Sequence, residues 1–127
     1  MRIEHFAVQV ASPTEMTSWY QKHLGLRIIR HVGGIAGTCF LADDSDRVLL
    51  EIYSNPKVVT PDYASMHPLL LHMAFVSDDV QRDCDRLARA GATVIDAPFV
   101  SPAGDSLAML RDPWGLAIQL CCRAKQM

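Results

Sequence analysis

The sequence repeats its own order of elements and polar residues, and this internal repeat limits the possible folds more than any other feature. His5-Phe6-Ala7 near the start of the chain matches His72-Met73-Ala74 in its middle. His5 precedes Glu51 by 46 residues, and His72 precedes Gln119 by 47 residues. Two units with polar residues at matching places predict a symmetric pair of modules, and they indicate that these polar residues share one site.

The first unit has the signals of a strand, a helix and three further strands. Alternating apolar residues predict a strand over 3–10. Ser12 as N-cap and Glu15 as its capping-box partner predict the start of a helix, with Pro13 in the first helical position. Gly25 stands where a helix ends on a left-handed residue. Further strands are predicted over 26–32, 38–42 and 48–53.

A second unit with the same order follows a loop, residues 55–68, that contains three prolines. Its helix is predicted to begin at Ser77-Asp78-Asp79 and to end at Gly91. Its strands are predicted over 69–76, 93–100, 105–110 and 116–121. The predicted fold class is therefore α+β, with two paired βαβββ modules, about 1–54 and 69–123, inside a single domain.

In four of these strands, the alternation of side chains separates a large apolar face from a face that carries one metal-competent residue. These residues are His5, Glu51, His72 and Gln119. The opposite faces carry Phe6, Val8 and Val10; Val48, Leu50 and Ile52; Leu71, Met73 and Phe75; and Leu116, Ile118 and Leu120. The pattern predicts a curved, mixed sheet with helices outside and a polar site inside the curve.

The composition limits the kinds of molecule that the protein is expected to bind. The chain has 127 residues, 50% of them hydrophobic, and a formal net charge of -2, which gives no electrostatic footprint for nucleic acid or an anionic membrane. No apolar run approaches the roughly 18 residues of a membrane-spanning helix. Glu4 and Gln9 interrupt any signal peptide. The cysteines lack CxxC spacing and are expected to be small buried residues in a reducing compartment: Cys39, Cys84, Cys121 and Cys122. We therefore expect a cytoplasmic protein with a small-molecule partner.

Five segments carry a family resemblance that extends over nearly the whole chain. They are Ile3-Glu4-His5-Phe6-Ala7; Trp19-Tyr20 with Leu24-Gly25-Leu26; Leu50-Glu51-Ile52; Leu71-His72-Met73-Ala74-Phe75; and Asp112-Pro113-Trp114-Gly115 before Gln119. With them the chain resembles the vicinal oxygen chelate superfamily, also called the glyoxalase/bleomycin-resistance/dioxygenase family. The resemblance implies a glyoxalase-like cup around one divalent metal ion, in a homodimer. It also implies that the metal ligands are His5, Glu51, His72 and Gln119, and that the metal stabilises an oxyanion.

Gln119 departs from the family pattern, because glyoxalase I and the extradiol dioxygenases normally have glutamate there. An amide oxygen can bind a metal, but glutamine is neutral and cannot accept a proton. Two imidazoles, one carboxylate and one amide oxygen suit an octahedral site for Ni, Zn, Co, Mn or Fe(II). The substitution disfavours an Fe(II) ring-cleaving dioxygenase and leaves Glu51 as the only carboxylate base. Gln9 is a second departure, since it stands where the family often has a basic residue for glutathione.

The same residues also have structural interpretations. A single histidine such as His5 or His72 is more often a hydrogen-bonded core residue than a metal ligand. Glu51 lies in an apolar run, where an unpaired carboxylate is strongly destabilising, so a cation could pair with it instead. The candidates for that pairing are Lys22, Arg27, Arg30 and Arg47. Structural roles are expected for Trp19, Tyr20, His23 and Trp114, whereas His31 and His67 stay unassigned.

Two classes of function follow. The first is a metal-dependent isomerase or lyase of glyoxalase or epimerase type, in which Glu51 moves a proton of a small oxygen-chelating carbonyl substrate. The second is a non-catalytic protein of bleomycin-resistance type, which sequesters a small molecule in the same cup. Gln119 favours the second class, whereas the intact His5, Glu51 and His72 favour the first. The methylglyoxal–glutathione adduct is only the family's default substrate.

Overall fold

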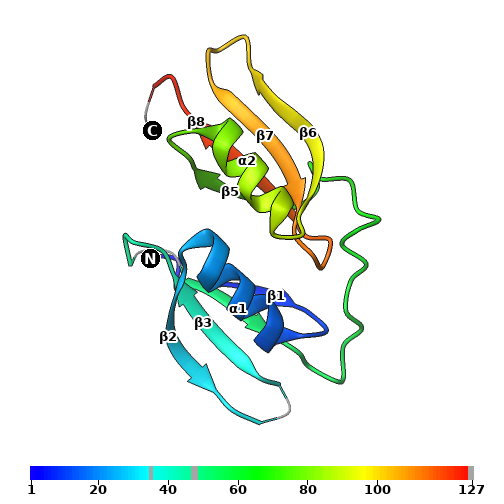
Figure 1. Cartoon of the computed structure of the whole chain (residues 1–127). Coiled ribbons are helices and arrows are strands. Elements are labelled where there is room, and N and C mark those ends of the chain that lie inside the picture. Colours follow the sequence, from blue (N-terminus) through cyan, green and yellow to red (C-terminus); the bar gives the residue numbers. More distant parts are fainter. Residues whose placement is uncertain (35, 47–48, 126–127) are drawn as a thin grey trace. The chain divides into compact units, whose positions relative to one another are not determined.

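The structure is a computed structural model that describes residues 1–34, 36–46 and 49–125. The chain divides into two compact units, residues 1–61 and 62–127, each of which has its own sheet and helix (Figure 1). Arg47 and the predicted strand residue Val48 lie outside the described residues.

The first unit is a four-stranded mixed sheet with one helix. Its elements are β1 (Phe6–Gln9), α1 (Pro13–Leu24), β2 (Arg27–Val32), β3 (Thr38–Ala42) and β4 (Leu49–Tyr53). The strands are ordered β1-β4-β3-β2, with β1 and β4 parallel and the other pairs antiparallel. The first and last strands of the unit are therefore neighbours in space.

The second unit has the same topology. Its elements are β5 (His72–Val76), α2 (Val80–Arg89), β6 (Thr93–Val100), β7 (Ser106–Arg111) and β8 (Ala117–Cys122). The order β5-β8-β7-β6, with β5 and β8 parallel, repeats that of the first unit strand by strand. The predicted α+β fold class with two βαβββ units is confirmed.

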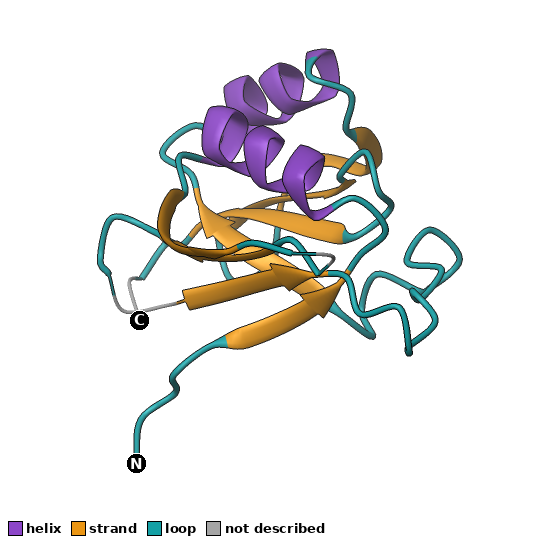
Figure 2. Ribbon diagram, turned by 90° about the horizontal axis from the view of Figure 1, so that it is seen from below, coloured by secondary structure: helices purple, strands orange, loops and turns teal. Residues whose placement is uncertain are grey.

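In each unit the helix packs against its own sheet, and the apolar faces predicted from strand alternation supply part of the core: Val8, Val10, Leu50, Ile52, Leu116, Ile118 and Leu120 (Figure 2). Met16 and Tyr20 of α1 are fully buried, as is Ile52 of β4. Leu87 of α2 and Ile118 of β8 are fully buried in the second unit. Four members of the predicted faces are less buried than expected: Phe6, Leu71, Met73 and Phe75. Full burial of one large apolar side chain stabilises the fold by about 1.5–3 kcal/mol.

Two predicted strands begin three residues later than expected. β1 begins at Phe6 rather than at residue 3, and β5 begins at His72 rather than at residue 69. The delay of β5 has a local cause, because Leu69 donates its backbone N–H to Nδ1 of His67 and Leu70 donates to the carbonyl of His67. These bonds close a turn, which prevents residues 69–71 from joining the sheet.

The predicted capping box at the start of α1 does not form. The Ser12 side chain makes no capping hydrogen bond, and its backbone ψ of 74° lies outside the extended region typical of an N-cap. The second helix is capped as expected, because Oδ1 of Asp79 accepts a 2.9 Å hydrogen bond from the backbone N–H of Arg82. Gly25 adopts the predicted left-handed conformation with φ of 71°.

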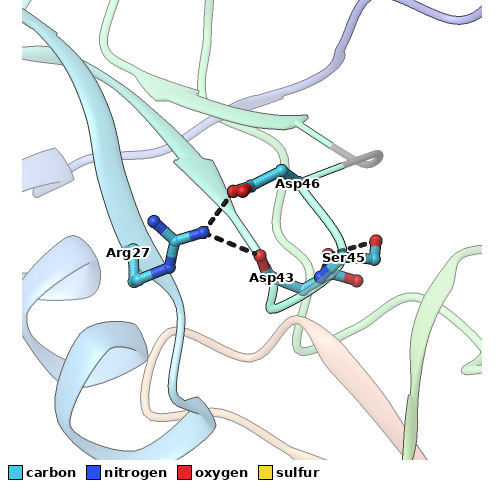
Figure 3. Close-up of polar contacts among 4 residues, drawn as sticks. All are labelled: Arg27, Asp43, Ser45 and Asp46. Carbon is cyan, nitrogen blue, oxygen red and sulfur yellow. Dashed lines mark hydrogen bonds and ion pairs between the residues drawn. The ribbon is translucent and has the colours of Figure 1, made fainter.

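Arg27 holds the acidic turn between β3 and β4. Its guanidinium forms an ion pair with Asp46 and donates a 3.4 Å hydrogen bond to the backbone carbonyl of Asp43 (Figure 3). The carboxylate of Asp43 in turn accepts hydrogen bonds from the backbone and hydroxyl of Ser45. The positive charge of Arg27 is therefore engaged in this turn.

The loop before β5 is fastened to the turn between β7 and β8. One guanidinium nitrogen of Arg111 donates to the carbonyls of Tyr63 and Gly115 at 2.8 Å each, and another donates to that of Met66 at 2.6 Å. Gly115 approaches the loop so closely that a Cβ there would lie 2.7 Å from the backbone nitrogen of Ala64. The loop therefore depends on the absence of a side chain at position 115.

Three of the four cysteines are buried, as predicted, and all four are free thiols. Burial raises the pKa of the Cys84 thiol. Cys122 is only half buried. Neither helix of the described chain is long and apolar enough to cross a membrane.

We predict that Gly115→Ala destabilises the protein by about 2–4 kcal/mol, because it combines an unfavourable positive φ with a backbone clash. The matched control is Gly25→Ala, which also has positive φ but meets nothing within 4 Å. The control should cost only about 1 kcal/mol. Urea denaturation measures both free energies of unfolding, and equal losses would contradict the close approach to Ala64.

Candidate functional site

The first unit brings two of the predicted ligands together. Ala7 of β1 pairs with Glu51 of β4, and His5 precedes Ala7 by two residues, so His5 and Glu51 occupy the same face of the sheet. Nε2 of His5 lies 3.2 Å from Oε2 of Glu51. The side chain of Glu51 is 20% exposed and that of His5 is 35% exposed. The two groups therefore meet at a partly covered surface of the sheet.

The other ring nitrogen of His5 has a partner of its own. Nδ1 contacts the carboxylate of Glu4, and the ring makes an edge-on contact with Phe40 at a centroid distance of 5.6 Å. The hydrogen bond to Glu4 raises the pKa of His5 above its ordinary value of 6.5. Partial burial opposes the rise in this pKa, and the negative charges of Glu4 and Glu51 add to it.

The second unit repeats this arrangement. Ala74 of β5 pairs with Gln119 of β8, and His72 precedes Ala74 by two residues, so His72 and Gln119 share one face. Nδ1 of His72 lies 3.0 Å from the carbonyl oxygen of Pro68. Because a carbonyl only accepts hydrogen bonds, this contact assigns the proton to Nδ1 and leaves the lone pair on Nε2. Such a bond is the orienting contact expected of a metal-binding histidine.

The donor groups of both pairs fit a divalent metal. Each pair consists of one imidazole nitrogen and one side-chain oxygen, which are ordinary ligands of Ni, Zn, Co, Mn and Fe(II). Two adjacent ligands at about 2.1 Å on an octahedral ion are about 3.0 Å apart, close to the 3.2 Å between His5 and Glu51. Within the described residues of either unit, no group of three His, Cys, Asp or Glu side chains gathers closely enough to hold a metal.

Among the described residues the partner of Glu51 is His5 rather than Lys22, Arg27 or Arg30. Arg27 is engaged by Asp46, and the guanidinium of Arg30 lies 6.0 Å from the centre of the Phe40 ring. Lys22 is an exposed residue of α1, and Arg47 lies outside the described residues. Sequence reasoning missed the contacts of His5 with Glu4 and Phe40. Glu4 beside a candidate ligand was the one available signal for them.

Gln9 is a loop anchor. It is only 7% exposed, and its amide bonds the backbone of the turn after β4. Oε1 accepts from the N–H of Asn55 at 2.9 Å, while Nε2 donates to the carbonyls of Asn55 and Val58 at 3.2 and 3.3 Å. These bonds hold the turn at the end of β1, on the same strand face as His5.

A shallow cavity of about 320 Å³ lies elsewhere in the second unit. It is bounded by the start of α2, the end of β6 and Cys122. The four predicted ligands do not line it. The adjacent thiols of Cys121 and Cys122 therefore have different surroundings. Cys122 lines this cavity, whereas Cys121 contacts the carbonyl of Phe75 at 3.4 Å.

Comparison with known proteins assigns the family. Residues 2–120 match the Glyoxalase/Bleomycin resistance protein/Dioxygenase superfamily. The chain belongs to this superfamily. It is 26% identical over 125 residues to proteins named lactoylglutathione lyase from Neisseria meningitidis serogroup A and serogroup B. These matches cover 94% of this chain and 88% of each relative.

Solved structures of the superfamily have the same fold. A glyoxalase/bleomycin resistance protein from Streptomyces sp. CB03234 is 26% identical, with a TM-score of 0.64 and coverage of 91% of this chain and 95% of that one. TnmS3, an antibiotic binding protein from the same source, is 24% identical, with a TM-score of 0.71 and coverage of 94% and 93%. Glyoxalase I from Zea mays is 21% identical, with a TM-score of 0.78. The match covers 98% of this chain and 46% of the maize protein.

We predict that Glu4→Gln lowers the pKa of His5 toward 6.5 in the metal-free protein, and by more than Glu51→Gln does, because the bond to Glu4 is its largest cause. An NMR titration of the ring resonances measures both shifts. The raised pKa means that protonated His5 stabilises the folded state at low pH, and that this stabilisation is lost as pH rises through the raised value. A pKa unmoved by Glu4→Gln would contradict the assigned contact.

Proposed function

We propose that the protein is a metal-dependent isomerase or lyase of glyoxalase or epimerase type, acting on a small carbonyl substrate with vicinal oxygens. The observation that carries this proposal is the convergence of His5 and Glu51 at 3.2 Å on one face of the sheet. The 26% identity to lactoylglutathione lyases over 94% of the chain supports the same class of reaction.

The proposed metal ligands are His5 and Glu51 of the first unit together with His72 and Gln119 of the second. Support comes from the matching register, because each oxygen ligand pairs with the alanine two residues after its histidine. When bound, a divalent ion would supply Lewis-acid polarisation of the substrate's vicinal oxygens. The Pro68 carbonyl holds the ring of His72 in the tautomer that can bind a metal through Nε2.

Glu51 is the proposed general base. Its carboxylate takes a proton from the carbon next to the substrate carbonyl and returns it to the neighbouring position. Gln119 holds the equivalent position in the second unit, but its amide cannot accept a proton at working pH. Proton transfer is therefore one-sided, with a single carboxylate in both directions.

The proposed homodimer agrees with the family's habit, and a monomer in sedimentation at tens of micromolar would reject it.

The alternative is sequestration without turnover. Gln119 favours it, because the neutral amide removes one of the two negative charges that a metal-binding enzyme of this family normally uses. The structural similarity to TnmS3, an antibiotic binding protein, is compatible with it. Metal content and turnover together separate the two functions.

We predict that purified protein takes up one divalent ion per site when offered Ni, Zn, Co or Mn. The double variant His5→Ala, His72→Ala should lose this uptake, because it removes both nitrogen ligands. His31→Ala is the control, since His31 lies in β2 outside the proposed ligand set and should bind metal normally. Elemental analysis after gel filtration measures the content. Absence of stoichiometric uptake, or uptake unchanged in the double variant, would refute the metal site.

We predict that Glu51→Gln reduces turnover about a hundredfold or more at saturating metal, as expected for a lost general base. The assay uses small α-hydroxycarbonyls, diketones and thiol adducts, including the methylglyoxal–glutathione adduct. Gln119→Glu is the matched change on the other unit; it should tighten metal binding and keep the proton transfer by Glu51. Intact turnover in Glu51→Gln would assign the proton to another group, and no turnover with any substrate would favour sequestration.

A further inference from the structure

Four cross-strand paired residues form a row across the sheet of the first unit, and the proposed base Glu51 is one of them. Ala7 of β1 pairs with Glu51 of β4, Glu51 pairs with Phe40 of β3, and Phe40 pairs with Arg30 of β2. Directly paired residues point to the same face of a sheet. Arg30 therefore lies on the face of Glu51, two strands away, which is about 9–10 Å between their backbones.

A β-bulge is what brings Arg30 to this face. The pairing of β2 with β3 runs from Ile28 opposite Leu41 directly to Arg30 opposite Phe40, so Ile29 is an extra residue. Leu41 is fully buried, which places Ile28 on the helix side of the sheet. Without the extra residue, strict alternation would put Arg30 on the helix side as well. Bulges commonly re-aim a side chain in this way beside functional sites.

The guanidinium of Arg30 is exposed and positioned by aromatic contacts. It lies 6.0 Å over the ring of Phe40, whose edge contacts the ring of His5. Among the residues that the structure describes, no carboxylate lies within ion-pair distance of Arg30, whereas Arg27 and Arg123 each have an aspartate partner. Arg30 thus presents a planar, charged donor group to the same face as the proposed base.

The equivalent row in the second unit has different charges. It runs from Ala74 through Gln119 and Met109 to Asp96, and β6 has a register shift at the same place as β2. The position of Arg30 is therefore occupied by an aspartate, just as that of Glu51 is occupied by an amide. Only the row of the first unit combines a carboxylate base with a cation that can bind an anion.

We propose that Arg30 is the specificity-determining residue of the site and binds a terminal carboxylate of the substrate. The proposal rests on the proposed function, because it places the reacting oxygens beside Glu51. The substrate class is a small carbonyl compound with vicinal oxygens at one end and a carboxylate about two strand spacings away. A planar guanidinium can bind a carboxylate through two parallel N–H···O hydrogen bonds. Phe40 acts as a positioning residue for the guanidinium.

The test compares two acids with the same carbon chain and the same vicinal oxygens. 2-Oxosuberate has a second, terminal carboxylate, and 2-oxooctanoate does not. Titration calorimetry measures both affinities on the full chain, as purified and after loading with Mn²⁺. Wild-type protein should bind 2-oxosuberate about tenfold more tightly, the effect expected for one charge-assisted hydrogen-bonded pair.

Arg30→Gln should abolish this preference without changing the affinity for 2-oxooctanoate, because it removes the charge and leaves the other end of the site intact. Arg30→Lys should keep part of the preference, since it retains the charge but not the planar donors. Arg27→Gln is the matched control in the same strand and should keep all of it, because Arg27 is paired with Asp46. Circular dichroism checks that each variant is folded.

Equal binding of the two acids by the wild type, a preference that survives Arg30→Gln, or binding of neither acid would overturn the role of Arg30. These outcomes differ from failure of the proposed function. An Arg30-dependent preference in a protein that takes up no metal would reject the metalloenzyme and keep the carboxylate site. Metal uptake and turnover without the preference would do the reverse.

Discussion

The parallel pairing of the first and last strand in each unit is the interaction on which the rest of the structure depends. It joins residues 44 positions apart in the first unit and 45 in the second, and it sets Glu51 opposite Ala7 and Gln119 opposite Ala74. A slip of one residue would turn every side chain of a strand to the other face. Burial of apolar residues under the helix opposes such a slip, because Leu50 and Ile52 on one side of Glu51's strand are buried against α1. The core therefore determines where the polar residues lie.

The two units have the same backbone but different electrostatics. Glu51, Phe40 and Arg30 of one row correspond to Gln119, Met109 and Asp96 of the other. These differences make the two units chemically distinct. The proposed base Glu51 and the proposed carboxylate-binding Arg30 lie in the same unit, an arrangement that would favour one orientation of an asymmetric, anionic ligand. The shared topology therefore carries different charges in the two units.

Loops near these faces are held by neutral or backbone hydrogen bonds. Gln9 fastens the turn after β4, and Arg111 fastens the loop before β5 through three carbonyl oxygens. Buried polar groups of this kind need all their partners, since an unsatisfied one is destabilising by about 1–3 kcal/mol. In the second unit the anchored loop carries the Pro68 carbonyl, which orients the ring of His72. The hydrogen bonds that anchor this loop therefore also help to position the carbonyl that orients His72.

The sequence by itself determined the order of the elements, the two βαβββ units and the faces of His5, Glu51, His72 and Gln119, because apolar alternation and helix-end residues are local signals. Only the tertiary structure decided which partners these residues contact. The bulge at Ile29 breaks the period on which strand parity relies, so the face of Arg30 could not be read from alternation. The contact of His5 with Phe40 and the late start of β5 at His72 depend in the same way on cross-strand packing and on a hydrogen-bonded turn. No local sequence pattern links the residues in these contacts, and only the folded structure shows them together.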